Sequence, residues 1–172
     1  MDKVLIAKAT IFNNELKSKG LTIIAAESIT AGLLASTIAS VSGASAVLKG
    51  SIVTYSENLK MNLLDVNPLT LGSYTAESRQ TTDEMCLGLK KLYPEVSIHV
   101  AITGVASTPV DDNYKIINPV GQVFLSILYA GKLYRFEQKI EGDEVDQRNS
   151  IRANTVIYIL EKVLEIITEK LN

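Results

Sequence analysis

Cysteine and histidine are almost absent from this sequence, whose 172 residues include one of each, Cys86 and His99. A single cysteine excludes a disulfide within the chain, and one cysteine with one histidine excludes a Cys/His metal cluster. The acidic residues show no metal-ligand spacing either, so we expect no metal. His99 stands in an apolar stretch, where a histidine is usually structural, and this disfavours Ser-His and Cys-His nucleophiles.

Long apolar runs and clusters of basic residues are also lacking. No stretch approaches the ~20 apolar residues that a membrane helix needs, and there is no secretory leader pattern, so we expect a cytoplasmic protein. The net charge is −2, and Lys90-Lys91 is the only adjacent basic pair. We therefore expect neither nucleic acid nor a membrane surface as partner, but a small solute or a protein.

The sequence does contain enough apolar material for one core, because 47% of its residues are hydrophobic and the length fits a single domain over residues 1–172. Periodicity and turn residues predict strands at 21–26, 46–55, 97–103, 120–129 and 133–140. They predict helices at 3–17, 33–41, 57–64, 76–92 and 146–171, with Thr75 as N-cap of the fourth and a break at Asn67-Pro68. The predicted fold class is therefore α/β, a three-layer α/β/α sandwich with a mixed sheet that has an antiparallel edge.

The most informative stretch is Ala26 to Gly32, where a buried strand turns sharply into a helix. Such a turn directs unpaired N–H groups and the positive end of the helix dipole at one point, which suits a phosphate or carboxylate. We expect Ser28, Thr30 and the backbone of Ala31 and Gly32 to line that site. An equally weighted alternative is that Ser28 and Thr30 only cap the helix and that Glu27 is a surface charge.

Ligands bind at the carboxyl ends of strands in α/β sheets, and three predicted strands here end in polar pairs: Glu27-Ser28, Tyr55-Ser56 and Thr103-Gly104. We expect these loops to meet at one pocket. A buried lysine amine can deprotonate a serine, so Lys60 and Ser45 are candidates for a base and a nucleophile. Spacing alone favours simpler roles, a solvated charge for Lys60 and a loop hydroxyl for Ser45.

Five stretches carry a family resemblance: AESITAG at 26–32, SGASA at 42–46, VTYSENLK at 53–60, TGVA at 103–106 and PVG at 119–121. In this order they resemble the motifs of the CinA C-terminal domain family, which comprises competence-damage-inducible proteins and stand-alone nicotinamide-mononucleotide deamidases. The resemblance covers nearly the whole chain.

The resemblance implies an amidohydrolase that converts nicotinamide mononucleotide to nicotinate mononucleotide and ammonia in pyridine-nucleotide salvage, without metal or cofactor. By similarity, Ser45 is the nucleophile and Lys60 its base, with Tyr55 and Ser28 in support. We accordingly expect Ser28, Ser45, Tyr55 and Lys60 to face one cleft.

Two arginines, Arg148 and Arg152, match arginines at the start of the family's last helix and could bind the phosphate of a mononucleotide. Thr103 and Gly104 are further expected substrate contacts. Relatives are typically oligomers, and the helices at the two ends of the chain carry apolar stripes, so we expect a homodimer or a larger homo-oligomer.

The chain departs from the family pattern at Ile29 and Ala31, where the family usually has Cys and Gly. It also departs in the loop from Ala106 to Tyr114, which replaces a glycine-rich segment, and at Asn118, which replaces a lysine. We expect the loop from Ser107 to Asn118 to set substrate choice. The departures suit a deamidase of shifted specificity, or alternatively a non-catalytic nucleotide-binding or interaction protein.

Overall fold

The fold is built on one mixed sheet. The computed structural model describes residues 2–108 and 117–169 and arranges five strands in the order β2-β1-β3-β4-β5. The parallel strands are β1 (Ile23–Glu27), β2 (Leu48–Val53) and β3 (Ile98–Gly104), and the antiparallel edge consists of β4 (Gln122–Tyr129) and β5 (Lys132–Lys139). The predicted mixed sheet with an antiparallel edge is confirmed.

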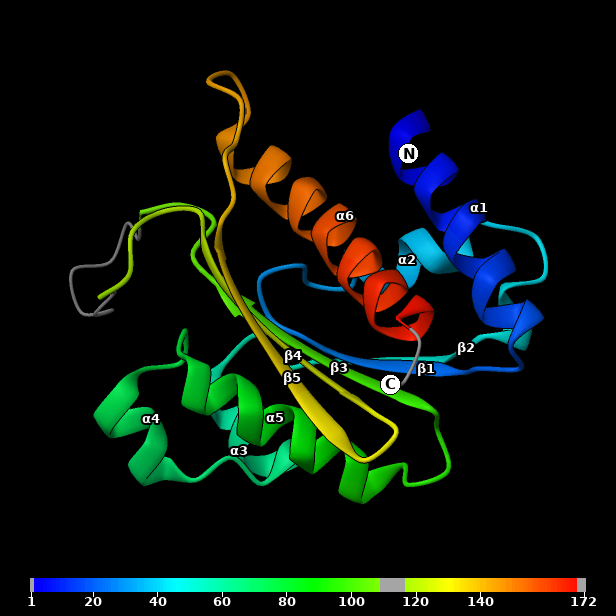
Figure 1. Cartoon of the computed structure of the whole chain (residues 1–172). Helices are drawn as coiled ribbons and strands as arrows, with labels where there is room; N and C mark the ends of the chain where they lie inside the picture. The colour runs from blue at the N-terminus through cyan, green and yellow to red at the C-terminus, as the bar shows by residue number, and fades with distance from the viewer. Residues whose placement is uncertain (1, 109–116, 170–172) are drawn as a thin grey trace.

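Helices cover both faces of the sheet, as Figure 1 shows. One face carries α1 (Lys3–Ser18), α2 (Leu33–Ala39) and α6 (Gln147–Thr168), and the other carries α3 (Glu57–Leu64), α4 (Pro68–Tyr74) and α5 (Arg79–Leu92). Each face has its own apolar core, because β-strand side chains alternate between the two layers of helices. The three-layer α/β/α prediction is confirmed. Within the described residues, no helix combines the length and the apolar character that a membrane crossing requires.

The apolar stripes of the two terminal helices are buried within the fold of this chain. Leu5, Phe12 and Leu16 of α1 and Ile159 and Val163 of α6 belong to one buried cluster on the sheet. The expected homo-oligomer therefore stays a prediction, and these stripes no longer support it.

Two backbone irregularities lie at glycines. The register of β1 and β2 shifts between Ile23, which pairs with Leu48, and Ile24, which pairs with Gly50, so a β-bulge lies at this point. Ala130 and Gly131, with φ of 48° and 79°, form the two-residue hairpin turn between β4 and β5.

The region between Leu64 and Arg79 differs from the prediction. Asn67 caps a helix instead of ending one, since its side chain accepts a bond from the Leu69 amide and Pro68 opens α4. Thr75 is not the N-cap of α5, because it lies at the C-terminal end of α4 with φ 71°, and Ser78 caps α5 by accepting from the Thr81 amide. Glu77 consequently precedes α5.

Candidate active site

The carboxyl ends of the parallel strands meet as expected. The Ser28 amide, directly after β1, donates to the Ile102 carbonyl of β3 at 3.1 Å, and the Thr54 amide, directly after β2, donates to the Glu27 carbonyl at 2.9 Å. The segments that leave these three strands therefore start side by side at one edge of the sheet. The candidate site is built on this edge.

Lys60 and Ser28 form a direct pair there. Ser56 caps α3 with its side chain, and this places Lys60 one turn inside the helix. The Lys60 Nζ donates to Ser28 Oγ at 3.0 Å and to the Thr54 carbonyl at 2.7 Å. Lys60 is 0% exposed and Ser28 is 6% exposed, so this lysine is not the solvated helix charge that spacing alone favoured.

Burial changes the acid–base behaviour of Lys60. Loss of hydration disfavours the ammonium form and lowers the pKa of Lys60 from 10.5 to about 8, although the carboxylates of Glu77 and Glu57 act in the opposite direction. At a pKa of about 8, roughly a tenth of the amine is unprotonated at pH 7. Lys60 can therefore accept a proton from Ser28 under neutral conditions.

Ser45 is not part of this pair, and the expected contact between Ser45 and Lys60 is wrong. Ser45 lies in a short 3-10 turn, Ala44–Ala46, before β2 begins, whereas Lys60 contacts Thr54 after β2 ends. The six residues of β2 separate the two side chains by roughly 20 Å. Ser45 is exposed at the amino end of the strands, so the four predicted residues do not share one cleft.

Glu27 fills the anion site that the turn offers. Its carboxylate is 0% exposed and accepts bonds from the hydroxyls of Thr30 and Ser51 and from the amides of three residues in the first turn of α2. These amides belong to Gly32, Leu34 and Ala35, at 2.9–3.1 Å. The helix dipole and its free N–H groups are thus satisfied internally.

The expected roles of Thr30, Ala31 and Gly32 change accordingly. The Thr30 hydroxyl turns inward to Glu27 at 2.7 Å, and the Gly32 amide is already donated, so neither group is available to a ligand in this arrangement. Ala31 has φ 48° and Gly32 φ 89°, both in the left-handed region. That conformation favours glycine at both positions and gives a physical reason for the glycine that the family usually has where Ala31 stands.

Arg148 and Arg152, the two arginines of α6, lie at the same edge of the sheet. Arg148 donates to the Tyr55 hydroxyl at 2.7 Å and to the Ser107 hydroxyl, and so connects the segments after β2 and β3. Arg152 donates to the Thr30 carbonyl at 3.0 Å. Two guanidinium groups therefore lie beside the turn that carries Ser28.

Thr103 and Gly104 lie at the expected edge but have packing roles. Thr103 is 0% exposed, and its hydroxyl is 2.7 Å from that of Thr82 on α5. A Cβ on Gly104 would lie 2.6 Å from the Gln122 carbonyl, so a side chain is excluded by the neighbouring strand. His99 is structural as predicted, since it is 1% exposed and its Nε2 lies 2.8 Å from the Tyr93 carbonyl.

Two residues of the site region were missed from the sequence: Glu27 as a buried group and Glu77. A charged residue that directly follows an apolar strand was the available signal for Glu27; for Glu77 we find none. Of the loop from Ser107 to Asn118, residues 109–116 lie outside the described part of the chain, and Asn118 donates to the Glu77 carbonyl at 2.6 Å. Among the described residues, no three His, Cys, Asp or Glu side chains group as metal ligands.

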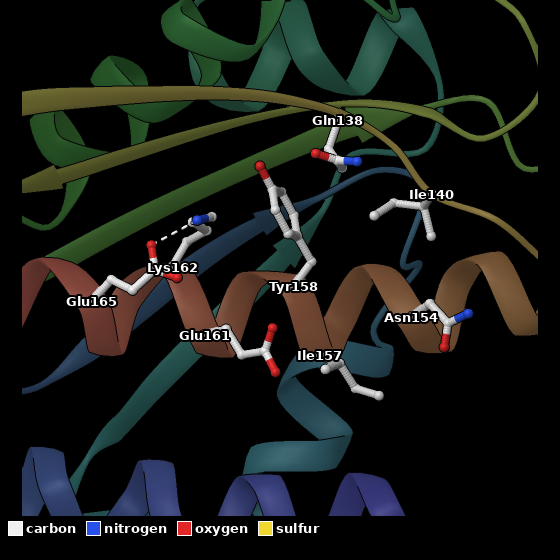
Figure 2. A pocket seen from close by; sticks show the side chains of 8 residues that line it. All are labelled: Gln138, Ile140, Asn154, Ile157, Tyr158, Glu161, Lys162 and Glu165. Carbon is white, nitrogen blue, oxygen red and sulfur yellow. Dashed lines mark hydrogen bonds and ion pairs between the residues drawn. The ribbon is translucent and has the colours of Figure 1, made fainter.

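An open groove between β5 and α6 is separate from this site. Figure 2 shows its lining, which includes Tyr158 and the ion pair between Lys162 and Glu165 at 2.6 Å. None of the lining residues belongs to the Ser28 and Lys60 region.

Comparison with known proteins assigns the family. The model of the CinA C-terminal domain matches residues 6–167. The chain belongs to this family. It is 39% identical to the MG115 homolog of Mycoplasma pneumoniae, over 94% of this chain and 98% of that protein. It is 35% identical to a CinA-like protein of Petrotoga mobilis, over 94% of this chain but 38% of that protein, so the chain spans little more than a third of this longer relative.

A solved structure agrees with the CinA assignment. The competence/damage inducible protein CihA from Agrobacterium tumefaciens superposes with a TM-score of 0.85 at 28% identity, over 98% of both chains. The fold described above is thus that of a CinA-superfamily domain.

Proposed function

We propose that this CinA-family chain is a metal-independent amidohydrolase that deamidates nicotinamide mononucleotide, as a cytoplasmic step of pyridine-nucleotide salvage. Ser28 is the nucleophile and Lys60 is its base. The observation that carries the proposal is the 3.0 Å contact between Lys60 Nζ and Ser28 Oγ, with both side chains buried at the edge of the sheet where α/β proteins bind ligands. The substrate is the one that the family resemblance implies.

The proton transfers and bond changes of the reaction use these two side chains and a water. Neutral Lys60 takes the Ser28 proton while Oγ bonds to the carboxamide carbon. Lys60 then gives this proton to the leaving nitrogen, the C–N bond breaks, and ammonia departs from an acyl-Ser28. A water, deprotonated by Lys60, adds to the acyl carbon, and breakage of the ester bond returns that proton to Ser28 and releases the carboxylic acid, which loses its own proton to solvent and leaves as the carboxylate.

The turn around Ser28 offers donors for the negative oxygen of such an intermediate. The amides of Ile29 and Thr30 follow Ser28 directly, and neither donates to an acceptor within the described residues. Backbone donors beside the nucleophile are the usual means of stabilising an oxyanion. We assign these two amides that role.

The phosphate is assigned to Arg148 and Arg152. Glu27 occupies the first turn of α2, so the helix end cannot serve a second anion. Among the described residues, Arg148 donates to the neutral hydroxyls of Tyr55 and Ser107, and an anionic phosphate would compete well with these neutral acceptors for the guanidinium group.

The test is ammonia release from nicotinamide mononucleotide, with two serine variants as a matched pair. We expect S28A and K60M to abolish turnover, whereas S45A keeps wild-type activity because Ser45 lies at the other end of β2. Full activity in S28A, or loss of activity in S45A with a normal unfolding curve, would contradict the proposal. Nucleotide binding without any ammonia release by the wild type would favour the non-catalytic alternative.

A further inference from the structure

Thr54 carries a buried hydroxyl that the reaction above does not use. Its side chain is 0% exposed, and its Oγ1 has no hydrogen-bond partner within residues 2–108 and 117–169. Burial of a hydroxyl without a partner is unfavourable, so such groups in folded proteins usually meet a water or a ligand. Thr54 is also a direct neighbour of the candidate site, because its carbonyl accepts a bond from Lys60 Nζ at 2.7 Å.

The Thr54 side chain lies on the same face of the sheet as Lys60. Along β2, Ser51 donates to Glu27 on the α2 face, whereas Ile52 packs against the apolar core on the other face. Thr54 continues this alternation, since its amide still bonds to the Glu27 carbonyl of β1. It therefore shares the face of Ile52, which is covered by α3, the helix that carries Lys60 (Figure 1).

Ser28 is the neighbour of Thr54 across the two strands. Glu27 pairs with Val53 in the parallel register of β1 and β2, so the next pair is Ser28 with Thr54. Neighbouring strands lie about 4.8 Å apart, and with both side chains on the α3 face the two hydroxyl oxygens are roughly 5 Å apart. This separation is too long for one hydrogen bond, but it suits two bonds of about 2.8 Å through a single water.

Lys60 can bond to the same water. An ammonium group has three N–H donors, and two of those on Lys60 bond to Ser28 Oγ and to the Thr54 carbonyl. A third donor, the Thr54 hydroxyl and the Ser28 hydroxyl together give a water three partners, which is the usual number for a buried water. The strand register thus brings a water site to the side of the candidate nucleophile.

We propose that Thr54 is a positioning residue, which holds the water that hydrolyses the acyl-Ser28 intermediate. This role rests on the proposed function, whereas the water site itself rests only on the buried hydroxyl and the register. The water bonded to Thr54 Oγ1 lies beside Lys60 Nζ, which takes its proton, and beside the acyl carbon, to which its oxygen adds. Lys60 passes this proton to Ser28 Oγ as the ester bond breaks, and Thr54 contributes hydrogen bonds without exchanging a proton.

The first experiment observes the water without any assay of activity. A crystal structure of the full chain should show an ordered water within about 3.2 Å of Thr54 Oγ1 and of Lys60 Nζ or Ser28 Oγ. The same water should be lost in T54V, because valine keeps the shape of threonine but has no hydroxyl. A Thr54 Oγ1 with no water, or one bonded to a protein atom instead, would overturn the inference.

The second experiment tests the role of the water in the proposed reaction. With nicotinamide mononucleotide, T54V should release about one equivalent of ammonia in a burst and then turn over roughly ten- to a hundredfold more slowly than the wild type. Its kcat/KM, which reports formation of acyl-Ser28, should stay within about twofold of the wild type, and intact-protein mass spectrometry should show the acyl adduct. T54S, which keeps the hydroxyl, should behave as the wild type does. T54A is a second variant without the hydroxyl if T54V does not fold.

T37V is the matched control. Thr37 on α2 also has a buried hydroxyl without a partner in the described part of the chain, but α2 covers the opposite face of the sheet from α3. T37V should therefore keep the wild-type kcat and form no adduct. An equal fall of kcat and kcat/KM in T54V, without a burst, would overturn the role of Thr54 in hydrolysis. A wild type that releases no ammonia would refute the proposed function, and the crystal structures would then decide the water site by themselves.

Discussion

Replacement of Lys60 by methionine tests whether a lysine amine is truly buried beside Ser28. Methionine has nearly the length of the lysine stem but no charge, so K60M removes the cost of placing an ammonium group in the interior. It also removes the bonds to Ser28 and Thr54, which lowers stability by an amount that does not depend on pH to first order. The informative quantity is therefore how the difference in stability between K60M and the wild type changes with pH.

The sign follows from the direction of the pKa change. The pKa of Lys60 is about 8 in the folded state, against 10.5 ordinarily, so the fold favours the neutral amine. Well above pH 10.5 the amine is neutral in both states and carries no penalty, and the wild type loses stability as the pH falls from there towards 8. Between pH 10 and pH 7 this loss amounts to about 2.5 kcal/mol. Below about pH 7 the penalty is constant.

Urea denaturation of both proteins at pH 7, 8, 9 and 10 measures this difference, because groups that titrate alike in both proteins cancel. We expect the unfolding free energy of K60M, relative to the wild type, to rise by about 2.5 kcal/mol from pH 10 to pH 7. Parallel curves, with a difference that stays constant over this range, would show that the Lys60 amine is hydrated and would remove the physical basis for its role as a base.

Four further substitutions, the last of them a control, test the framework of the site by urea denaturation at pH 7. E27Q places an amide group where five donors bond to the Glu27 carboxylate, and it should lower the unfolding free energy by about 3 kcal/mol or more. A decrease of less than about 1 kcal/mol would contradict the described hydrogen-bond network. A31G removes the strain of an alanine in the left-handed backbone conformation and should raise the unfolding free energy by about 0.5–1 kcal/mol. A destabilised variant would refute this strain argument. G88A forces a methyl group into the backbone carbonyl of Leu64 and should lower the unfolding free energy by about 1–3 kcal/mol. G72A, at a helical glycine with open space around it, should raise the unfolding free energy by about 0.5–1 kcal/mol. Equal effects of the two variants would argue against the close packing of α5 on α3.

The sequence alone determined the layers of this protein and most of its elements. Apolar periodicity and turn residues located α1 and the full extent of α3, and they predicted the mixed sheet with its antiparallel edge. These features depend on local preferences of the backbone and on burial of one face, which a single sequence displays directly. The ordered motifs also indicated the CinA family, which the family comparison confirms.

Only the tertiary structure decided which serine meets Lys60. Ser28 and Ser45 are both small polar residues in loops next to strands, and the local sequence does not show at which end of β2 each loop lies. The parallel pairing of β1 with β2 places Ser28 beside Thr54 and leaves Ser45 at the far end of β2. The burial of Glu27 could not be predicted from the sequence either. A glutamate is ordinarily a surface residue, and Glu27 becomes buried because the start of a helix folds onto it. Which side chains meet at a site depends on contacts between segments far apart in the chain, and these arise only when the sheet assembles.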